Sequence, residues 1–297
     1  MPRPFVIDTD TASDDAVALL VALRDPQVEV RAITVVGGNV PVEQGVQNAL
    51  YTVEMAGAEA PVHAGVDGAV HNGKHVHGED GMGDIGLDLH GREPASLDAV
   101  SVIVDEVRAA PGEVTLVTLG PLTNVAAAFE RAPDVPRKLR ALVVMGGTSD
   151  GIGNVTPVAE YNVWADIPSA AAVFAAGAPL TMVGWDVSRK YAVITPADMD
   201  ELRTLGPLGA FSVDIQRTLV EFCRTQTKLD GFDLPDPITT AIAVDPSVAT
   251  ATRRARVTVD PETGQTMLVD AGEPRVDVVV EASRERFVAL LRDALRG

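Results

Sequence analysis

The sequence is short of cysteine and of basic residues, and each shortage excludes a class of protein. Cys223 is the single cysteine among 297 residues, so no disulfide can form within the chain. Lysine and arginine total 24 against 42 aspartates and glutamates, which gives a formal charge of −18. Such acidity disfavours nucleic acids and anionic membranes as partners, but it is compatible with a neutral or cationic small molecule.

Long apolar runs and targeting signals are also missing. No apolar stretch is long enough to span a bilayer, and the first residues lead into a strand pattern without a basic region and an apolar signal core. Cys223 falls in a helical pattern, where we expect it to pack rather than to act as a nucleophile. These features predict a cytoplasmic protein. Because no linker or low-complexity segment interrupts the chain, we also expect one domain over residues 1–297.

What the sequence does contain is a repeated alternation of strand and helix patterns. It predicts an α/β protein with one doubly wound, mostly parallel, Rossmann-like sheet. Strands are expected at 5–8, 28–39, 114–120, 139–147 and 179–186, and short ones near 254–281. Helices are expected at 14–25, 40–57, 96–110, 121–133, 167–177, 196–206, 208–228, from about 236, and at 283–295. Residues 66–93 and 148–163 lack a period and are expected to be loops.

Polar or glycine residues stand at the ends of four predicted strands. They are Asp8 and Asp10, residues 37–39, residues 119–120 and residues 145–147. Ligands of open α/β sheets bind beyond the carboxyl ends of the strands. We therefore expect the active site at this edge of the sheet.

Four aspartates, Asp8, Asp10, Asp14 and Asp15, lie within eight residues and repel one another. A hard divalent cation with oxygen ligands is the simplest counter-charge. The expected helix N-terminus adds about 0.3–1 kcal/mol per acid. Helix capping accounts for Asp14 or Asp15 alone, but not for all four. The spacing differs from that of an EF-hand, so further ligands must come from distant segments.

The segment "FVIDTDTA" also fits the start of haloacid-dehalogenase-like phosphatases, in which Asp8 would be the phosphoryl nucleophile. That alternative requires a downstream lysine and an acidic pair. Lys190 is a candidate for the lysine, but no clear acidic motif follows it, and the adjacent Asp14 and Asp15 are unusual for those enzymes.

Five separated segments resemble the inosine–uridine-preferring nucleoside hydrolases, in the order of that family. They are "DTDTASDDAVAL" (8–19), "TVVGGN" (34–39), "LGPLTNVA" (119–126), "GNVTPVAEYNVWADIPSAA" (153–171) and "PDPITTAIAVDPSV" (235–248). The resemblance implies an enzyme that hydrolyses the N-glycosidic bond of ribonucleosides to ribose and free base with a bound Ca²⁺. It also implies a homodimer or homotetramer.

The same resemblance assigns roles to individual residues. The metal ligands would be Asp10, Asp15, the backbone carbonyl of Leu119, and Asp236, with Asp8 near the metal and its water. Asp10 would also be the general base. The ribose would be bound by Asp14, Asn39, Met145, Asn154, Glu160 and Asn162. Carboxylates in this ring would stabilise the positive charge of an oxocarbenium-like transition state.

Simpler interpretations compete for some of these residues. Asn154 and Asn162 are common turn residues. Asp166 is expected to cap the helix that begins at Ile167. Trp164 and Trp185 are expected to pack rather than to stack on a base.

The chain departs from the family at Pro235, where many relatives have a histidine that protonates the departing base. Proline cannot donate a proton. His77, in the segment "VHGEDGMGD", resembles a family histidine that faces the base, and it is our candidate for the missing donor. His71 and His75 are weaker candidates, and Gln226, Phe232 and Asp233 are candidates to contact the base. The departure also leaves a second hypothesis open, a ribose- or nucleoside-binding protein with weak or lost turnover.

Overall fold

The centre of the molecule is a nine-stranded sheet, seen in the computed structural model, which describes residues 1–68, 76–227, 229–273 and 275–296. Parallel strands lie in the order β3 (Val62–Ala64), β2 (Val28–Val35), β1 (Arg3–Thr9), β4 (Thr115–Thr118), β5 (Ala141–Met145), β6 (Leu180–Val183) and β11 (Val276–Ala282). Antiparallel β9 (Ala249–Val259) and β10 (Thr266–Val269) extend the sheet beyond β11. The prediction of a mostly parallel sheet is confirmed.

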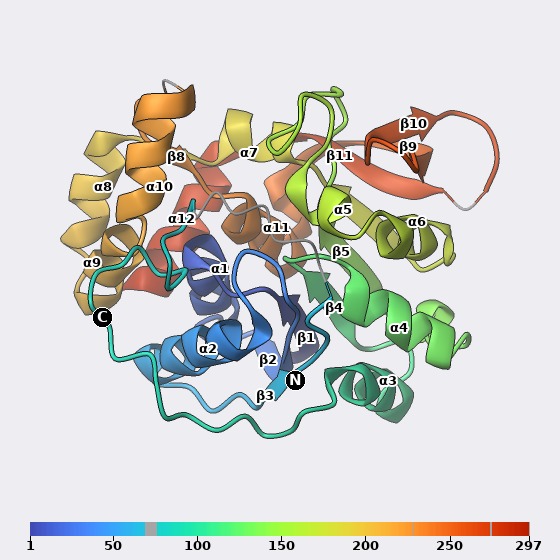
Figure 1. The fold of residues 1–297 in the computed structure, drawn as a ribbon, viewed down its shortest axis with the longest axis horizontal. Helices are drawn as coiled ribbons and strands as arrows, with labels where there is room; N and C mark the ends of the chain where they lie inside the picture. The colour runs from blue at the N-terminus through green and yellow to red at the C-terminus, as the bar shows by residue number, and fades with distance from the viewer. Residues whose placement is uncertain (69–75, 228, 274, 297) are drawn as a thin grey trace.

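Helices cover both faces of the sheet because successive strand residues point to opposite sides and are apolar on both (Figure 1). Phe5 and Ile7 pack with α1 (Ser13–Leu23), α2 (Val42–Ala56), α11 (Pro235–Val244) and α12 (Arg284–Leu295). Val6 lies in a second core with α3 (Ala99–Ala109), α4 (Thr123–Arg131) and α6 (Ile167–Ala175). The doubly wound architecture is therefore confirmed.

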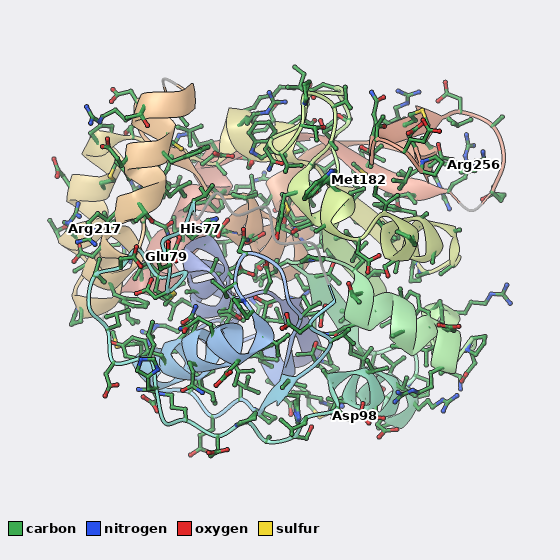
Figure 2. All side chains as sticks on the ribbon, in the orientation of Figure 1. His77, Glu79, Asp98, Met182, Arg217 and Arg256 are labelled. Carbon is green, nitrogen blue, oxygen red and sulfur yellow. The ribbon has the colours of Figure 1, made fainter. Side chains whose placement is uncertain are left out.

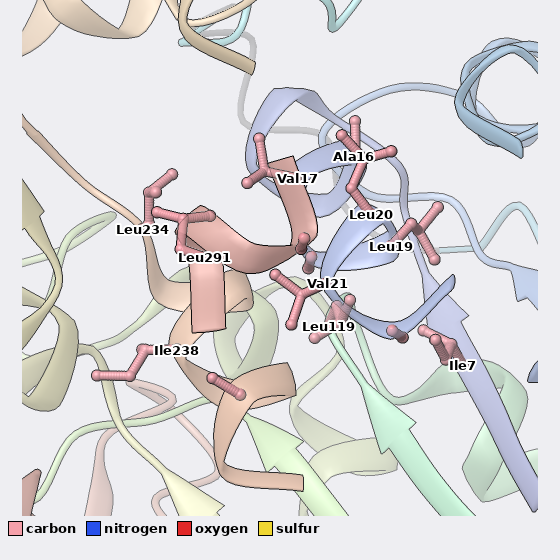
Figure 3. Close-up of a cluster of buried hydrophobic side chains, with 14 of the residues drawn as sticks. Ile7, Ala16, Val17, Leu19, Leu20, Val21, Leu119, Leu234, Ile238 and Leu291 are labelled. Atoms are coloured by element: carbon pink, nitrogen blue, oxygen red, sulfur yellow. The ribbon is translucent and has the colours of Figure 1, made fainter. Parts of the chain in front are cut away.

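Helix α1 lies inside the molecule rather than on its surface. Residues 13–22 are all buried, which suits the nearly uniform apolar sequence that follows its first turn. Figure 3 shows Val17 and Val21 near Leu291 of α12 and Leu234, just before α11. The acidic first turn of α1 is consequently held in the interior.

The remaining elements are short helices, helical turns and two short strands that connect the elements named above. They are η1 (Pro136–Lys138), α5 (Tyr161–Ala165), α7 (Trp185–Tyr191), β7 (Val193–Ile194), α8 (Pro196–Arg203), α9 (Pro207–Asp214), α10 (Arg217–Phe222), the π-helical turn η2 (Cys223–Thr227), β8 (Phe232–Asp233) and η3 (Pro246–Val248). Strands β7 and β8 form a separate antiparallel pair. Among the described residues, no helix combines the length and apolar character that a bilayer crossing requires.

Several predicted boundaries were wrong. The strand predicted at 179–186 ends at Val183, because Gly184 is the N-cap of α7, which begins at Trp185. The loop predicted at 148–163 contains most of α5, whose N-terminus is capped by the Glu160 side chain. The helix predicted at 208–228 is interrupted at Ile215 and Gln216 and becomes α9, α10 and η2. Strand β3 was not predicted, since three residues carry no readable period.

The order of the strands reverses between β1 and β4. From β1 the chain builds β2 and β3 on one side, and it then returns to build β4, β5 and β6 on the other. Asp8 is paired with Thr34 of β2 and Thr118 of β4 at the carboxyl ends of these strands. A reversal of this kind opens a crevice at that edge of the sheet, which is where ligands of such folds bind.

Candidate active site

Two buried helix N-termini bring carboxylates together at this crevice. Asp14 and Asp15 lie in the first turn of α1, and Asp236 lies in the first turn of α11. One carboxylate oxygen from each of these residues lies within 4.8 Å of the others. Asp10 directly follows β1 and begins the short connection to α1, and it is fully buried, as is Asp15.

Hydrogen bonds fix these carboxylates but leave several of their oxygens without a donor. Asp15 accepts from the Thr9 hydroxyl and from the Ala12 amide, and Asp10 Oδ2 accepts from the Asn39 amide. Asp8 Oδ1 accepts from Thr34 and Asn124. Three further oxygens, Asp8 Oδ2, Asp10 Oδ1 and Asp14 Oδ1, are buried and accept no hydrogen bond from the described residues.

Burial makes ionisation of this cluster costly. It raises the pKa of Asp8 and of Asp10 to about 7, and it raises the pKa of Asp15 and of Asp236 well above the ordinary value, with further contributions from neighbouring aspartates. No lysine or arginine among the described residues forms an ion pair with them.

The size of the repulsion explains why a cation fits here. Two carboxylates 4.8 Å apart repel by about 3 to 4 kcal/mol at an effective dielectric constant of about 20. A few such pairs approach the whole stability of an ordinary domain, which is about 5–15 kcal/mol. A hard divalent cation would remove the repulsion and occupy the unpartnered oxygens, which are the ligands it prefers.

A cavity of about 470 Å³ opens above the acids. Most of the residues predicted for the site line it: Asp14, Asn39, His77, Leu119, Met145, Asn154, Glu160, Asn162 and Asp236. Asp10 and Asp15 are not in its lining, because they lie fully buried below the floor. The structure therefore brings together segments that are more than 200 residues apart in the chain.

Glu160 and Asn162 hold the loop that forms one wall. Glu160 caps α5 and also accepts from the Gly147 amide, at 2.8 Å from Oε2. Burial raises its pKa to about 7. Asn162 Nδ2 donates to the Leu119 carbonyl at 2.7 Å, which leaves its Oδ1 for another partner. Asn154 Oδ1 accepts from the Tyr161 amide, which leaves the amide nitrogen of Asn154 as a donor.

His77 lies on the loop after the undescribed segment and reaches toward the start of α1 (Figure 2). Its Nδ1 is 2.8 Å from Ser13 Oγ and 3.5 Å from Asp14 Oδ1. Ser13 and Gln216, which lies between α9 and α10, share two further hydrogen bonds. The weaker candidates His71 and His75, and the side chain of Gln226, lie outside the described residues.

On the opposite wall, Asp233 had been named from the sequence as a candidate to contact the base, whereas Trp185 had been expected to pack. Trp185 and Asp233 line the cavity, and Asp233 Oδ2 accepts from Trp185 Nε1 at 3.1 Å and from the Ser188 hydroxyl at 2.7 Å. Arg189 stacks over the Trp185 ring at 4.4 Å. Trp185 thus faces the cavity, whereas Trp164 packs beside Tyr161 as expected. The lining also includes Val76, Val155, Tyr161, Leu219, Phe222, Cys223, Leu229 and Pro235.

Comparison with known proteins decides the family. The sequence model of the inosine-uridine preferring nucleoside hydrolases matches residues 5–289. The chain belongs to this nucleoside hydrolase family. It is 37% identical over 254 residues to a non-specific ribonucleoside hydrolase, RihC, of Shigella boydii, covering 84% of this chain and 82% of that one. A RihC of Escherichia coli is 39% identical over 213 residues, covering 70% and 69% of the two chains.

Solved nucleoside hydrolase structures have the same fold. A plant nucleoside hydrolase, PpNRh1, superposes with a TM-score of 0.94 at 32% identity and covers 100% of both chains. The purine-preferring ribonucleoside hydrolase of Gardnerella vaginalis gives a TM-score of 0.90 at 30% identity, covering 99% of this chain and 98% of that one.

Family membership confirms the resemblance seen in the sequence and the enzyme class, a glycosidase that hydrolyses N-glycosyl compounds. It does not fit the phosphatase alternative, whose lysine candidate, Lys190, is exposed on α7 and does not line the cavity.

Proposed function

We propose that this nucleoside hydrolase cleaves the N-glycosidic bond of ribonucleosides in a Ca²⁺-dependent reaction, releasing ribose and the free base. The observation that carries the proposal is the set of buried, unneutralised carboxylates directly beneath a cavity lined by amides and acids. Ribose is uncharged and rich in hydroxyl groups, and this lining offers both donors and acceptors to it. The non-specific ribonucleoside hydrolases among the relatives support the substrate class.

Asp10, Asp15, Asp236 and the Leu119 carbonyl would hold the ion. When bound, Ca²⁺ supplies a positive charge that orients and acidifies a water molecule and attracts the ribose diol. Asp10 Oδ1 accepts no hydrogen bond from the described protein. It is therefore available to take a proton from the attacking water as general base.

The other lining residues bind and polarise the sugar. Asp14 and Asn39 hold the 2′- and 3′-hydroxyls. The donor of Asn154, the Oδ1 of Asn162 and the Glu160 carboxyl group hold the remaining hydroxyls, with Met145 against the ring. As the bond to the base breaks, positive charge develops on the sugar, and the acids of the cavity stabilise it.

Departure of the base requires a proton that Pro235 cannot supply. We assign this donation to His77, which lines the same cavity as Pro235 and Asp14. We also propose that residues 1–297 act as one domain, that the protein is a homodimer or homotetramer, and that it works in the cytoplasm. These three statements rest on the sequence and on the resemblance to the family.

The proposal is tested with p-nitrophenyl riboside, inosine and uridine, assayed with Ca²⁺ and with a chelator. We expect cleavage with Ca²⁺ and its loss on chelation. Asp10→Asn keeps the shape of the side chain but loses the base, so turnover of all three substrates should fall by at least about 10²–10⁴-fold.

Asp98→Asn is the matched control, because Asp98 is an exposed helix cap far from the cavity, and it should retain wild-type turnover. Wild-type rates for Asp10→Asn would remove the assigned base. Nucleoside binding without cleavage of the nitrophenyl riboside, whose leaving group needs no proton, would instead fit the binding-protein hypothesis raised by Pro235.

A further inference from the structure

Hydrogen-bond direction around Ser13 can be worked out from its partners. Ser13 and Gln216 are both fully buried. Gln216 Nε2 lies 2.8 Å from the Ser13 carbonyl, and a carbonyl oxygen only accepts, so this end of the amide must be the nitrogen. The amide oxygen of Gln216 then lies 2.7 Å from Ser13 Oγ. Because that oxygen also only accepts, the Ser13 hydroxyl donates its one hydrogen to Gln216.

This direction fixes the proton on His77. Its Nδ1 is 2.8 Å from Ser13 Oγ, whose hydrogen is already used, so Nδ1 must be the donor in this bond. The nearest oxygen of Asp14 lies on the same side of the ring, 3.5 Å from Nδ1. A neutral histidine has one ring hydrogen, so its Nε2 is left with a lone pair.

We infer that Ser13 and Gln216 are positioning residues that hold His77 in its Nδ1–H tautomer and so present Nε2 to a ligand in the cavity. Neither side chain lines the cavity, and both act through the ring of His77. The tautomer follows from the hydrogen bonds alone. Its consequence for catalysis rests on the proposed function.

The consequence is that any proton passing from His77 to the departing base leaves from Nε2. Donation requires that Nε2 first takes up a proton from water, which makes the ring an imidazolium with a hydrogen on each nitrogen. The electron pair of the broken N-glycosidic bond then stays on the base, the base takes the Nε2 proton, and His77 returns to the neutral Nδ1–H form. If the ring carried its hydrogen on Nε2 while neutral, Nδ1 would face Ser13 as an acceptor, and the Ser13 hydroxyl would have to leave Gln216.

The direct test is an imidazole nitrogen spectrum of ¹⁵N-labelled wild-type protein at pH ~8.5, about two units above the ordinary histidine pKa. The His77 signals are identified by their loss in His77→Gln. We expect a protonated Nδ1 and an unprotonated Nε2, whereas a histidine free in water prefers the opposite tautomer. A protonated Nε2 in the wild-type protein would overturn the inference. The measurement needs no turnover, so its failure is distinct from failure of the proposed function.

A variant then tests the role of Gln216. Gln216→Met removes both amide bonds and frees the Ser13 hydroxyl to donate to Nδ1, so the His77 signals should shift toward Nε2–H. Turnover of inosine should fall by about 10–100-fold relative to turnover of p-nitrophenyl riboside.

Gln47→Met is the matched control, because Gln47 also uses both ends of its amide, in bonds to the backbone of Arg92, and neither residue lines the cavity. It should change neither the spectrum nor the ratio of rates. An unchanged His77 spectrum in Gln216→Met, or an equal loss on both substrates, would assign Gln216 a purely structural role and overturn the inference.

Discussion

The position of Asp10 depends on the absence of side chains at two neighbouring glycines. A Cβ atom at Gly38 would lie 2.1 Å from Asp10 Oδ2, and one at Gly120 would lie 3.0 Å from Asp10 Oδ1. These glycines follow β2 and β4, the two strands that flank β1. The segments "VVGGN" and "LGPL" are therefore needed for close approach of the backbone to one carboxylate, in addition to any role in turns.

Gly38→Ala should displace that carboxylate while leaving the fold in place. The clash is with the Asp10 side chain, which accepts from the adjacent Asn39 amide and has little room to move. A displacement of about 1 Å at a catalytic group costs roughly 100-fold in turnover, so we expect a loss of that size in kcat/KM. Isothermal titration should also show weaker binding of Ca²⁺.

Gly146→Ala provides the comparison, since it adds the same methyl group at the end of β5, where the nearest atom is 3.5 Å from the new Cβ. It should retain activity much better than Gly38→Ala. Equal activity in the two variants would show that the packing around Asp10 does not matter for catalysis.

Two consecutive short helices, α5 and α6, show how one structural device serves different purposes. Each begins with an acid whose side chain accepts from backbone amides of the first turn, Glu160 in α5 and Asp166 in α6. Asp166 also accepts from Thr123 and does not line the cavity. Glu160 does line it and additionally binds the Gly147 amide at the end of β5.

Replacing either cap with alanine should lower stability, but only one replacement should affect chemistry. The loss of an N-cap costs about 0.5–2 kcal/mol, which urea unfolding of Glu160→Ala and Asp166→Ala would measure. Turnover should fall by about 100-fold or more in Glu160→Ala, because a buried group that stabilises the transition state is lost. Asp166→Ala should keep near-wild-type turnover at temperatures where it is folded. Full activity in Glu160→Ala would reduce Glu160 to a helix cap.

The sequence predicted Asp166 as a cap because the pattern is local: an acid, then proline and small residues at the start of a helix. It did not predict α5, because the capping residue Glu160 lies in a segment without a period. It also extended β6 through Asp186, since "MVGW" reads as a continuous apolar run. Boundaries of this kind are set by backbone hydrogen bonds at glycines and caps, which hydrophobic periodicity does not record.

Across the whole molecule, the strand pattern alone predicts only the part of the site that lies at strand ends, whereas Asn154, Glu160 and Asp236 were predicted from the resemblance to the family. Asp10, Asn39, Leu119 and Met145 could be placed together because parallel strands end at a common edge. Arg189, Leu219 and Phe222 reach the same cavity from α7 and α10, and no strand-end rule applies to them. Their placement depends on how these helices pack over the crevice, which the sequence pattern does not specify.

Removal of the metal should make the free energy of unfolding depend on the protonation of these buried acids. Without a cation, Asp8, Asp10 and Glu160 have pKa values of about 7 in the folded protein, and Asp8 and Asp10 have a pKa of 3.8 without the fold. The folded state therefore binds more protons than the unfolded state between these values, so the free energy of unfolding should fall as pH rises from about 4 to about 7. Burial lowers the pKa of His63, which acts in the opposite direction, but it is a single group.

Calcium should reverse that trend. Its ligands must be deprotonated to bind, so stabilisation by the ion should grow with pH and reach about 2.7 kcal/mol at 100 times its Kd. Chemical unfolding in chelator and in Ca²⁺, from pH 5 to pH 8, gives both curves. Asp236→Asn should flatten the chelator curve and weaken the response to Ca²⁺, whereas Asp98→Asn, outside the cluster, should change neither. Rising stability of the metal-free protein over this range would mean that the buried acids are neutralised by something other than protons or a cation.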